Sequence, residues 1–213
     1  MALFEFSEVK FKDLLDLPAL AIEKERITTL VGPSGSGKTT ILKLLNKMLS
    51  PTGGRIMFNG ADLGRVNPVV HRRQVAMLSQ SPVIFEGTIR DNLQIGLKFQ
   101  EKDLPDDTVL LEILERVKLL KPLDSAAQTL SGGEKQRLAL GRVLLLDAAV
   151  YLLDEPSAAL DDQTEELIIE MINAHVRAAK KSLVMVTHSK AIAEEYSDTI
   201  IKIINGGRRW QEA

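Results

Sequence analysis

The sequence predicts an α/β fold in which helices cover both faces of a largely parallel sheet and a helical segment is inserted into that core. Short apolar strands alternate with amphipathic helices in the C-terminal third of the chain. A β-rich run leads directly into a glycine-rich loop and a helix, and the middle of the chain carries helical periodicity with no good strand. The 213 residues, 45% of them hydrophobic, suffice for one sizeable core.

The N-terminal part of the chain shows apolar strand patterns, two of them with period two, with turn residues around them. The run RITTLV is β-rich and enters the glycine loop, and Pro51 ends the helix that follows the loop. In chain order the patterns predict a strand over 3–11, a strand over 26–31, a helix over 39–49, a strand within 53–60 and a buried strand over 74–79 that ends at Gln80.

The pattern changes to helical spacing from Ser81 to about Gly141, with one of the helices opening at Ser131. Beyond it, AVYLLD, SLVMVT and TIIKII predict short buried strands separated by helices over 161–179 and 190–196. We therefore expect one domain over 1–213, with an α/β core formed by 1–80 and 142–213 and a helical part formed by 81–141.

Charge and composition exclude several classes of function. The formal net charge of −2 lacks the basic excess of an extended nucleic-acid surface, so we expect no nucleic-acid partner. The absence of cysteine excludes disulfides and thiolate chemistry and fits a reducing compartment. No apolar run approaches the ~18 residues that span a bilayer, and the charged, alternating N-terminus does not resemble a secretory signal. We expect a cytoplasmic protein that reaches a membrane only through a partner.

The segment GPSGSGKT matches G-x-x-x-x-G-K-[ST] between a strand and a helix. Glycines allow backbone N–H groups to wrap around phosphates, and the helix N-terminus adds its positive end. Lys38 would reach the β- and γ-phosphates, and the Thr39 hydroxyl would ligate Mg²⁺. A merely flexible loop would not explain the match in this context. The expected phosphate contacts are Gly32, Pro33, Ser34, Gly35, Ser36, Gly37, Lys38, Thr39 and Thr40.

Two carboxylates, Asp154 and Glu155, end the apolar strand AVYLLD. Ligands of open α/β sheets bind beyond the carboxyl ends of the strands. Asp154 is therefore expected in the Mg²⁺ shell, and Glu155 is expected to polarise an attacking water. An acidic strand end that faces solvent is the alternative, and on its own it is the commoner case. The phosphate loop makes the catalytic interpretation the better one.

Together these motifs resemble the nucleotide-binding subunits of ABC transporters over nearly the whole chain. GPSGSGKTT resembles their Walker A motif, VYLLDEP their Walker B motif with its glutamate, and LSGGEKQR their signature motif. Gln80 matches the Q-loop glutamine, SAALD (157–161) the D-loop, and His188 in VTHS the switch histidine. Six motifs in the family's order are far more specific than any one of them.

The resemblance implies a P-loop NTPase fold, with a RecA-like core, an N-terminal antiparallel β subdomain and an inserted α-helical signature subdomain. It also implies an ATP-hydrolysing subunit that powers a separate transmembrane permease from the inner face of the cell membrane, using ATP and Mg²⁺. The residues it assigns to catalysis are Glu155, His188, Lys38 and Gln80, and those it assigns to the metal are Thr39, Gln80 and Asp154.

In the family, the signature loop closes over the ATP of a second subunit in a head-to-tail dimer. Ser131 can cap its helix and offer a hydroxyl, and Gly132 and Gly133 permit close backbone approach. A simple serine-capped helix would explain Ser131 but not two glycines in the first turn, each of which costs up to ~1 kcal/mol relative to alanine. We expect Ser131, Gly132 and Gly133 to contact the ATP held by a second copy of the chain.

Some features depart from the family pattern. The segment before the Walker A motif is short, and Phe11 is the best-placed residue for stacking on adenine, although packing within a strand explains it equally well. PLDSAAQT (122–129) replaces the stretch that precedes the signature in many fused exporters, whereas SQSPVIFEGTIRDNL (79–93) looks exporter-like. With HRRQVAML, this combination most resembles small stand-alone ATP-binding subunits assigned to metal (iron) export, so export is slightly favoured over import.

Two other functions fit the sequence less well than transport. An ABC ATPase acting on DNA or ribosomes usually carries a long coiled-coil insertion or a second cassette, and the sequence has neither. A regulatory module without hydrolysis is disfavoured because Lys38, Asp154, Glu155 and His188 are all present. The two other histidines, His71 and His175, match no motif and are expected on the surface.

Overall fold

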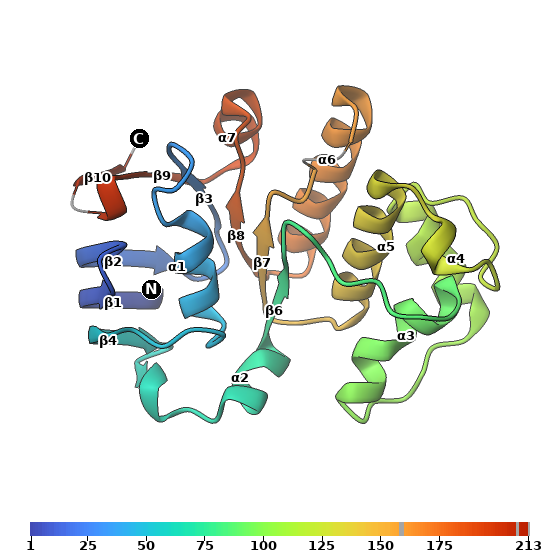
Figure 1. Ribbon diagram of the computed structural model, residues 1–213, viewed down its shortest axis with the longest axis horizontal. Coiled ribbons are helices and arrows are strands. Elements are labelled where there is room, and N and C mark those ends of the chain that lie inside the picture. The colour runs from blue at the N-terminus through green and yellow to red at the C-terminus, as the bar shows by residue number, and fades with distance from the viewer. Residues whose placement is uncertain (158–159, 208, 213) are drawn as a thin grey trace.

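The structure is a computed structural model that describes residues 1–157, 160–207 and 209–212. It contains an antiparallel sheet, a mostly parallel sheet and a group of helices at the far end from the antiparallel sheet (Figure 1). This arrangement confirms the predicted α/β fold with an antiparallel sheet near the N-terminus and an inserted helical part. The D-loop residues Ala158 and Ala159 lie outside the described residues.

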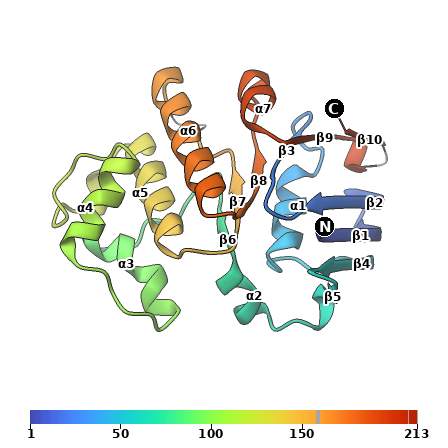
Figure 2. The same ribbon diagram turned by 180° about the vertical axis from the view of Figure 1, so that it is seen from behind.

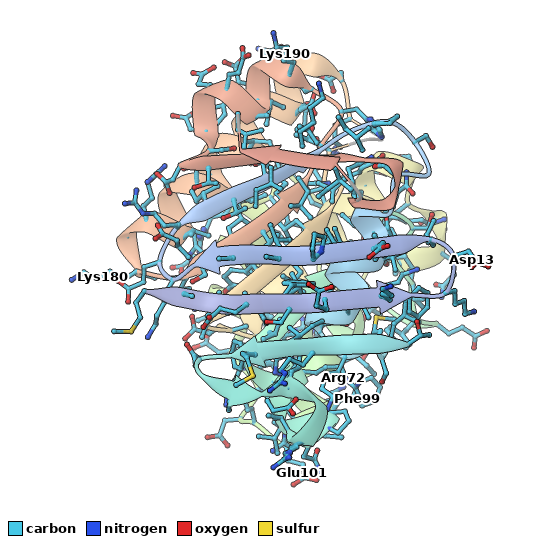
Figure 3. The ribbon with its side chains drawn as sticks, turned by 90° about the vertical axis from the view of Figure 1, so that its left-hand side faces the viewer. Asp13, Arg72, Phe99, Glu101, Lys180 and Lys190 are labelled. Atoms are coloured by element: carbon cyan, nitrogen blue, oxygen red, sulfur yellow. The ribbon has the colours of Figure 1, made fainter. Side chains whose placement is uncertain are left out.

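The antiparallel sheet has the strand order β2-β1-β4-β5, and Figure 3 views the molecule from this side. Its strand β2 was not predicted, because the alternation of buried residues changes phase at Pro18 and Ala19. Proline is tolerated here since β2 lies at the edge of the sheet. The strands are β1 (Ala2–Phe11), β2 (Leu15–Glu23), β4 (Gly53–Phe58) and β5 (Ala61–Asp62).

The second sheet has the order β10-β9-β3-β8-β7-β6 and is parallel except for the antiparallel edge strand β10. Parallel pairing brings the carboxyl ends of β3, β7 and β8 to one edge, with Leu30 beside Val186 and Asp154 beside Val186. The strands are β3 (Ile27–Val31), β6 (Val75–Leu78), β7 (Val150–Asp154), β8 (Ser182–Val186), β9 (Thr199–Ile204) and β10 (Arg209–Glu212).

The described part of the chain contains seven α-helices. Figures 1 and 2 place α3, α4 and α5 together at one end of the molecule, and α5 runs without a break across the expected boundary between residues 141 and 142. The helices are α1 (Lys38–Leu45), α2 (Pro68–Gln74), α3 (Ile89–Phe99), α4 (Asp107–Arg116), α5 (Gly132–Leu145), α6 (Asp162–Ala178) and α7 (Lys190–Tyr196), with short 3-10 turns at Leu63–Arg65, Ala127–Thr129 and Asn205–Gly207.

Strand β7 is buried throughout because both faces of its sheet are covered. Its side chains alternate between two cores. Val150 and Leu152 join the cluster that contains α1 and the antiparallel sheet. Tyr151 and Leu153 join the cluster formed by α5, α6 and the other helices of the helical end. The strand that carries Asp154 is therefore anchored on both sides.

The predicted surface positions of the two unassigned histidines are wrong. His71 is 1% exposed, because α2 turns it toward the end of α1 and its ring packs edge-on against Phe58, with centroids 4.8 Å apart. Its Nε2 lies 2.6 Å from the Leu45 carbonyl oxygen. His175 is half-buried beside Tyr151, with 3.3 Å between its Nε2 and the tyrosine hydroxyl.

Within residues 1–157, 160–207 and 209–212, the helices are all too short or too polar to cross a bilayer.

Candidate nucleotide site

A pocket of about 240 Å³ opens at the carboxyl edge of the parallel sheet. The loop after β3, the acidic end of β7 and the loop after β8 converge there, as expected for an open α/β sheet. The lining residues are Leu14, Ser34, Gly35, Gly37, Lys38, Thr39, Thr40, Gln80, Glu155 and His188.

The loop from Gly32 to Gly37 has a backbone that needs glycine at particular positions. Gly37 caps α1 with φ of 99°, and Gly32 has φ of 146°. A Cβ atom at Gly32 would lie only 2.1 Å from the Ile203 carbonyl oxygen of β9. A side chain at position 32 would therefore prevent the loop from packing this closely against β9.

Lys38 is folded over the loop, with its Nζ donating to the carbonyl oxygens of Gly32 at 2.8 Å and Pro33 at 3.0 Å. Burial lowers the pKa of Lys38, and the nearby carboxylates of Glu155 and Asp154 oppose that shift. Among the described residues, the hydrogen-bond acceptors of this buried ammonium are neutral carbonyl oxygens, so it is suited to an incoming anion.

Two further observations fit a phosphate ligand. The Ser36 hydroxyl is buried with no hydrogen-bond partner among the described residues. Gly35 has no atom within 4 Å of the place where a Cβ would be, so this side of the loop is open. An unpaired hydroxyl and a desolvated lysine on one glycine loop are the donors that a polyphosphate chain needs.

Asp154 lies behind the pocket lining, in contact with Thr39, which lines the pocket. The Thr39 hydroxyl donates to Asp154 Oδ1 at 3.1 Å, and Asp154 is 1% exposed. Burial raises the pKa of Asp154, while the Thr39 hydrogen bond acts in the opposite direction. One carboxylate and one hydroxyl, completed by phosphate oxygens and water, form a donor set that fits Mg²⁺.

Both carboxylate oxygens of Glu155 have a partner in the site. Its Oε2 accepts from Gln80 Nε2 at 2.8 Å, and its Oε1 lies 2.9 Å from His188 Nε2. Its backbone has φ of 50°, a left-handed conformation that is uncommon outside glycine. The structure thus brings together three residues that the sequence assigned to catalysis from distant positions, and Lys38 lines the same pocket.

The signature segment lies outside this pocket. Ser131 caps α5, its hydroxyl accepting from Glu134 N–H at 3.3 Å while Glu134 accepts from Ser131 N–H at 2.9 Å. These bonds lower the pKa of Glu134, with Lys121 adding to the effect. Figures 1 and 2 show α1 and α5 on opposite sides of β6, β7 and β8. Among the described residues, the pocket lining includes none of Ser131, Gly132 and Gly133.

Phe11 is not part of the described pocket lining. It is partly buried against the core cluster of the antiparallel sheet, and the Lys12 ammonium lies 5.4 Å from its ring centroid. Leu14, in the turn between β1 and β2, lines the pocket instead. No sequence signal distinguishes Leu14 from other turn residues.

Two more residues were missed although the sequence contained a hint of each. Gln136 lies inside LSGGEKQR and donates to the backbone carbonyl of Glu155 at 3.4 Å. Arg142 follows the same motif and places its guanidinium over Phe85, 5.2 Å from the ring centroid. Gln136 lies within the signature motif and Arg142 lies after it on the same helix, but the contacts of both depend on how α5 packs.

A strand, a phosphate-wrapping glycine loop, a helix and an acidic end of a neighbouring strand define the chain as a P-loop nucleotide-binding domain. The family model described as "ABC transporter" matches residues 15–158. The chain belongs to the ABC transporter family, as one of its ATP-binding, ATPase-class domains.

Similar proteins and structures agree with this membership. The chain is 37% identical over 185 residues to the "Probable iron export ATP-binding protein FetA" of Escherichia coli (strain K12), an alignment covering 86% of this chain and 81% of that protein. It is 35% identical over 205 residues to "Protein STAR1" of Oryza sativa subsp. japonica, covering 94% of this chain and 58% of that protein. The chain therefore spans less than two thirds of the length of STAR1.

Among solved structures, a bacterial Atm1-family ABC exporter with ATP bound superposes with a TM-score of 0.86 at 27% identity, covering 95% of this chain and 37% of that one. A dimeric ATP-binding cassette in a post-hydrolysis state, bound to ADP and Pi, superposes with a TM-score of 0.84 over 98% of both chains. Its 23% identity supports the shared fold.

Proposed function

We propose that the chain hydrolyses ATP in a Mg²⁺-dependent reaction, as a head-to-tail dimer that drives a separate membrane-spanning subunit. The observation that carries this proposal is the Glu155 carboxylate, held by Gln80 and His188 at the mouth of the Lys38 pocket. A carboxylate in that place can accept a proton from a water aimed at the γ-phosphorus.

Each residue has a role in the reaction. Lys38 leaves the loop carbonyls and neutralises the β- and γ-phosphate oxygens. Glu155 takes the proton of the attacking water as the water oxygen bonds to phosphorus and the bond to the ADP oxygen breaks. His188 donates to the γ-phosphate, and Gln80 orients the water. Bound Mg²⁺, held by Thr39 and Asp154, would neutralise charge on the phosphate oxygens.

The separation of the two glycine loops supports the proposed dimer. Six residues of the Walker A segment within 34–40 line the pocket, while the signature loop stands across the sheet with its Ser131 and Gly132 exposed. An exposed helix N-terminus that carries a serine and two glycines suits a phosphate of another subunit. A head-to-tail pair completes both sites.

The docking surface for the membrane-spanning subunit is proposed to be the groove beside β6 and α3. The groove has a volume of about 270 Å³, and Val83 and Phe99 on it are 64% and 67% exposed. Arg142 lies in this groove with one guanidinium nitrogen buried and unpaired among the described residues. We propose as occupant an apolar cytoplasmic segment of the membrane subunit with a carboxylate for Arg142. The likeness to an iron-export ATP-binding protein supports metal ions as cargo.

The test replaces Glu155 with Gln. The amide keeps the hydrogen bond with Gln80 but cannot accept a proton, so we expect ATP affinity within a few-fold of the parent and turnover lowered at least 100-fold. Gel filtration with Mg-ATP should show an accumulating dimer. Unchanged phosphate release would refute the role of Glu155, and a monomer at all ATP concentrations would refute the dimer.

A further inference from the structure

The signature helix touches the catalytic glutamate of its own chain. Gln136 of α5 is 4% exposed, and its Nε2 donates to the Glu155 backbone carbonyl at 3.4 Å. On the other side, the Glu155 N–H donates to the Val186 carbonyl oxygen of β8 at 3.0 Å. The peptide groups around Glu155 are therefore held between α5 and β8.

Glu155 needs such support because of its backbone conformation. Its φ of 50° costs a non-glycine residue about 1 kcal/mol. A strained residue keeps its conformation only when surrounding contacts hold it there. The direction of its side chain toward Gln80 and His188 depends on that conformation.

The same helix carries the signature loop at its N-terminus. Ser131 caps α5, and Gln136 follows five residues later, about 7.5 Å along the helix axis. The segment between them is regular helix. Because it moves as a rigid body, a displacement of its capped end also displaces Gln136. Ser131 thus acts at one nucleotide while Gln136 acts at another.

We propose that Gln136 is a positioning residue that couples the two ATP sites of the dimer, by setting the Glu155 backbone of its own chain according to the position of α5. This rests on the proposed head-to-tail dimer. When the signature loop engages the partner's ATP, α5 moves and the Gln136 amide adjusts Glu155 at the chain's own ATP.

The first test replaces Gln136 with Met, which has similar volume and no amide donor. We expect kcat to fall at least tenfold while the Kd for ATP, measured with a fluorescent analogue, stays within twofold. Gln128→Met is the matched control, because Gln128 also donates from this end of the molecule to a backbone carbonyl, that of Phe85 at 3.0 Å. Equal losses in both variants, or no loss for Gln136→Met, would overturn the proposal.

Mixed dimers then separate a cis effect from a trans effect. One chain carries Glu155→Gln, so single-turnover hydrolysis reports the site that uses the other chain's Glu155. When Gln136→Met is placed in the chain that keeps Glu155, it should slow that turnover tenfold. When it is placed in the Glu155→Gln chain, it should slow the turnover less than twofold. The reverse pattern, or an equal loss in both placements, contradicts the positioning role. Gln136→Ala, which adds no bulk, replaces Gln136→Met if the latter does not fold.

Gly132→Trp in the same mixed dimers tests the underlying arrangement. It should slow turnover most on the Glu155→Gln chain, because the signature loop serves the partner's ATP. If Gly132→Trp instead slows turnover most when it is placed in the chain that keeps Glu155, the head-to-tail arrangement is refuted. The two placements of Gln136→Met still report the contact with Glu155 in that case, so the two failures are distinguishable.

Discussion

At the scale of single residues, the glycines of the phosphate loop differ in what they permit. Gly32 and Gly35 both have positive φ, of 146° and 77°. A Cβ at Gly32 would overlap the Ile203 carbonyl oxygen, whereas a Cβ at Gly35 would meet no atom within 4 Å. The motif requires glycine at position 32 and allows any residue at position 35. The close contact of Gly32 with β9 explains why glycine is required there.

Alanine at these two positions should therefore have unequal effects. Gly35→Ala adds only the strain of a positive φ, about 1 kcal/mol, which lowers the melting temperature by roughly 2–4 °C in a chain of this size. Gly32→Ala adds a clash with backbone and should lower it by at least twice as much. Thermal unfolding without nucleotide measures both, and equal shifts would contradict the packing of the loop on β9.

At the scale of elements, the sequence predicted those whose signals are local. The strand before the glycine loop, the strand AVYLLD and the helix opening at Ser131 are all present, because apolar runs and a serine cap act over a few residues. Strand β2 was missed because Pro18 shifts its alternation. The burial of His71 was missed because it depends on contacts of α2 with α1 and β4, which are distant in sequence.

His71 joins these elements and should make their packing sensitive to acid. Its Nε2–H donates to Leu45, and its Nδ1 is buried with no described partner, so a second proton would face no acceptor. Burial lowers the pKa of His71 below its ordinary value of 6.5, although the Leu45 hydrogen bond opposes the shift. Below pH 6.5 the unfolded chain therefore binds a proton that the folded chain resists, and the free energy of unfolding falls as the pH falls.

His71→Gln tests this expectation. The variant keeps a donor for Leu45 but loses the edge-on contact with Phe58, so at pH 7.5 we expect it to be less stable by about 0.5–1.5 kcal/mol. Because glutamine does not titrate, its loss of stability between pH 7.5 and 5.5 should be smaller than that of the parent. Urea unfolding at both pH values measures the difference. A parallel decline in the two proteins would contradict the expectation, because it would show that His71 binds a proton in the folded chain as readily as in the unfolded chain.

At the scale of the whole molecule, the proposed head-to-tail dimer requires one chain to supply two unlike halves of a nucleotide site. Lys38, Thr39 and Glu155 line one pocket, and Gly132 stands apart from it at the exposed start of α5. The sequence indicated both loops but not the links between them, since the contact of Gln136 with Glu155 arises only when α5 packs against β6 and reaches the residue after β7. If two chains must pair to complete a site, as proposed, the ATPase activity depends on protein concentration.

Gly132→Trp separates folding and nucleotide binding from assembly. No atom lies within 4 Å of a Cβ at Gly132, so the indole projects into open space and the chain should keep its melting temperature within about 2 °C. At low protein concentration its ATP affinity should equal that of the parent, because the pocket in the same chain is untouched.

Turnover of the Gly132→Trp variant should fall at least 100-fold, and the parent's turnover per chain should rise with concentration until the dimer saturates. Loss of ATP binding by the dilute variant, or a parent turnover per chain that is independent of concentration, would show that each chain completes its own site.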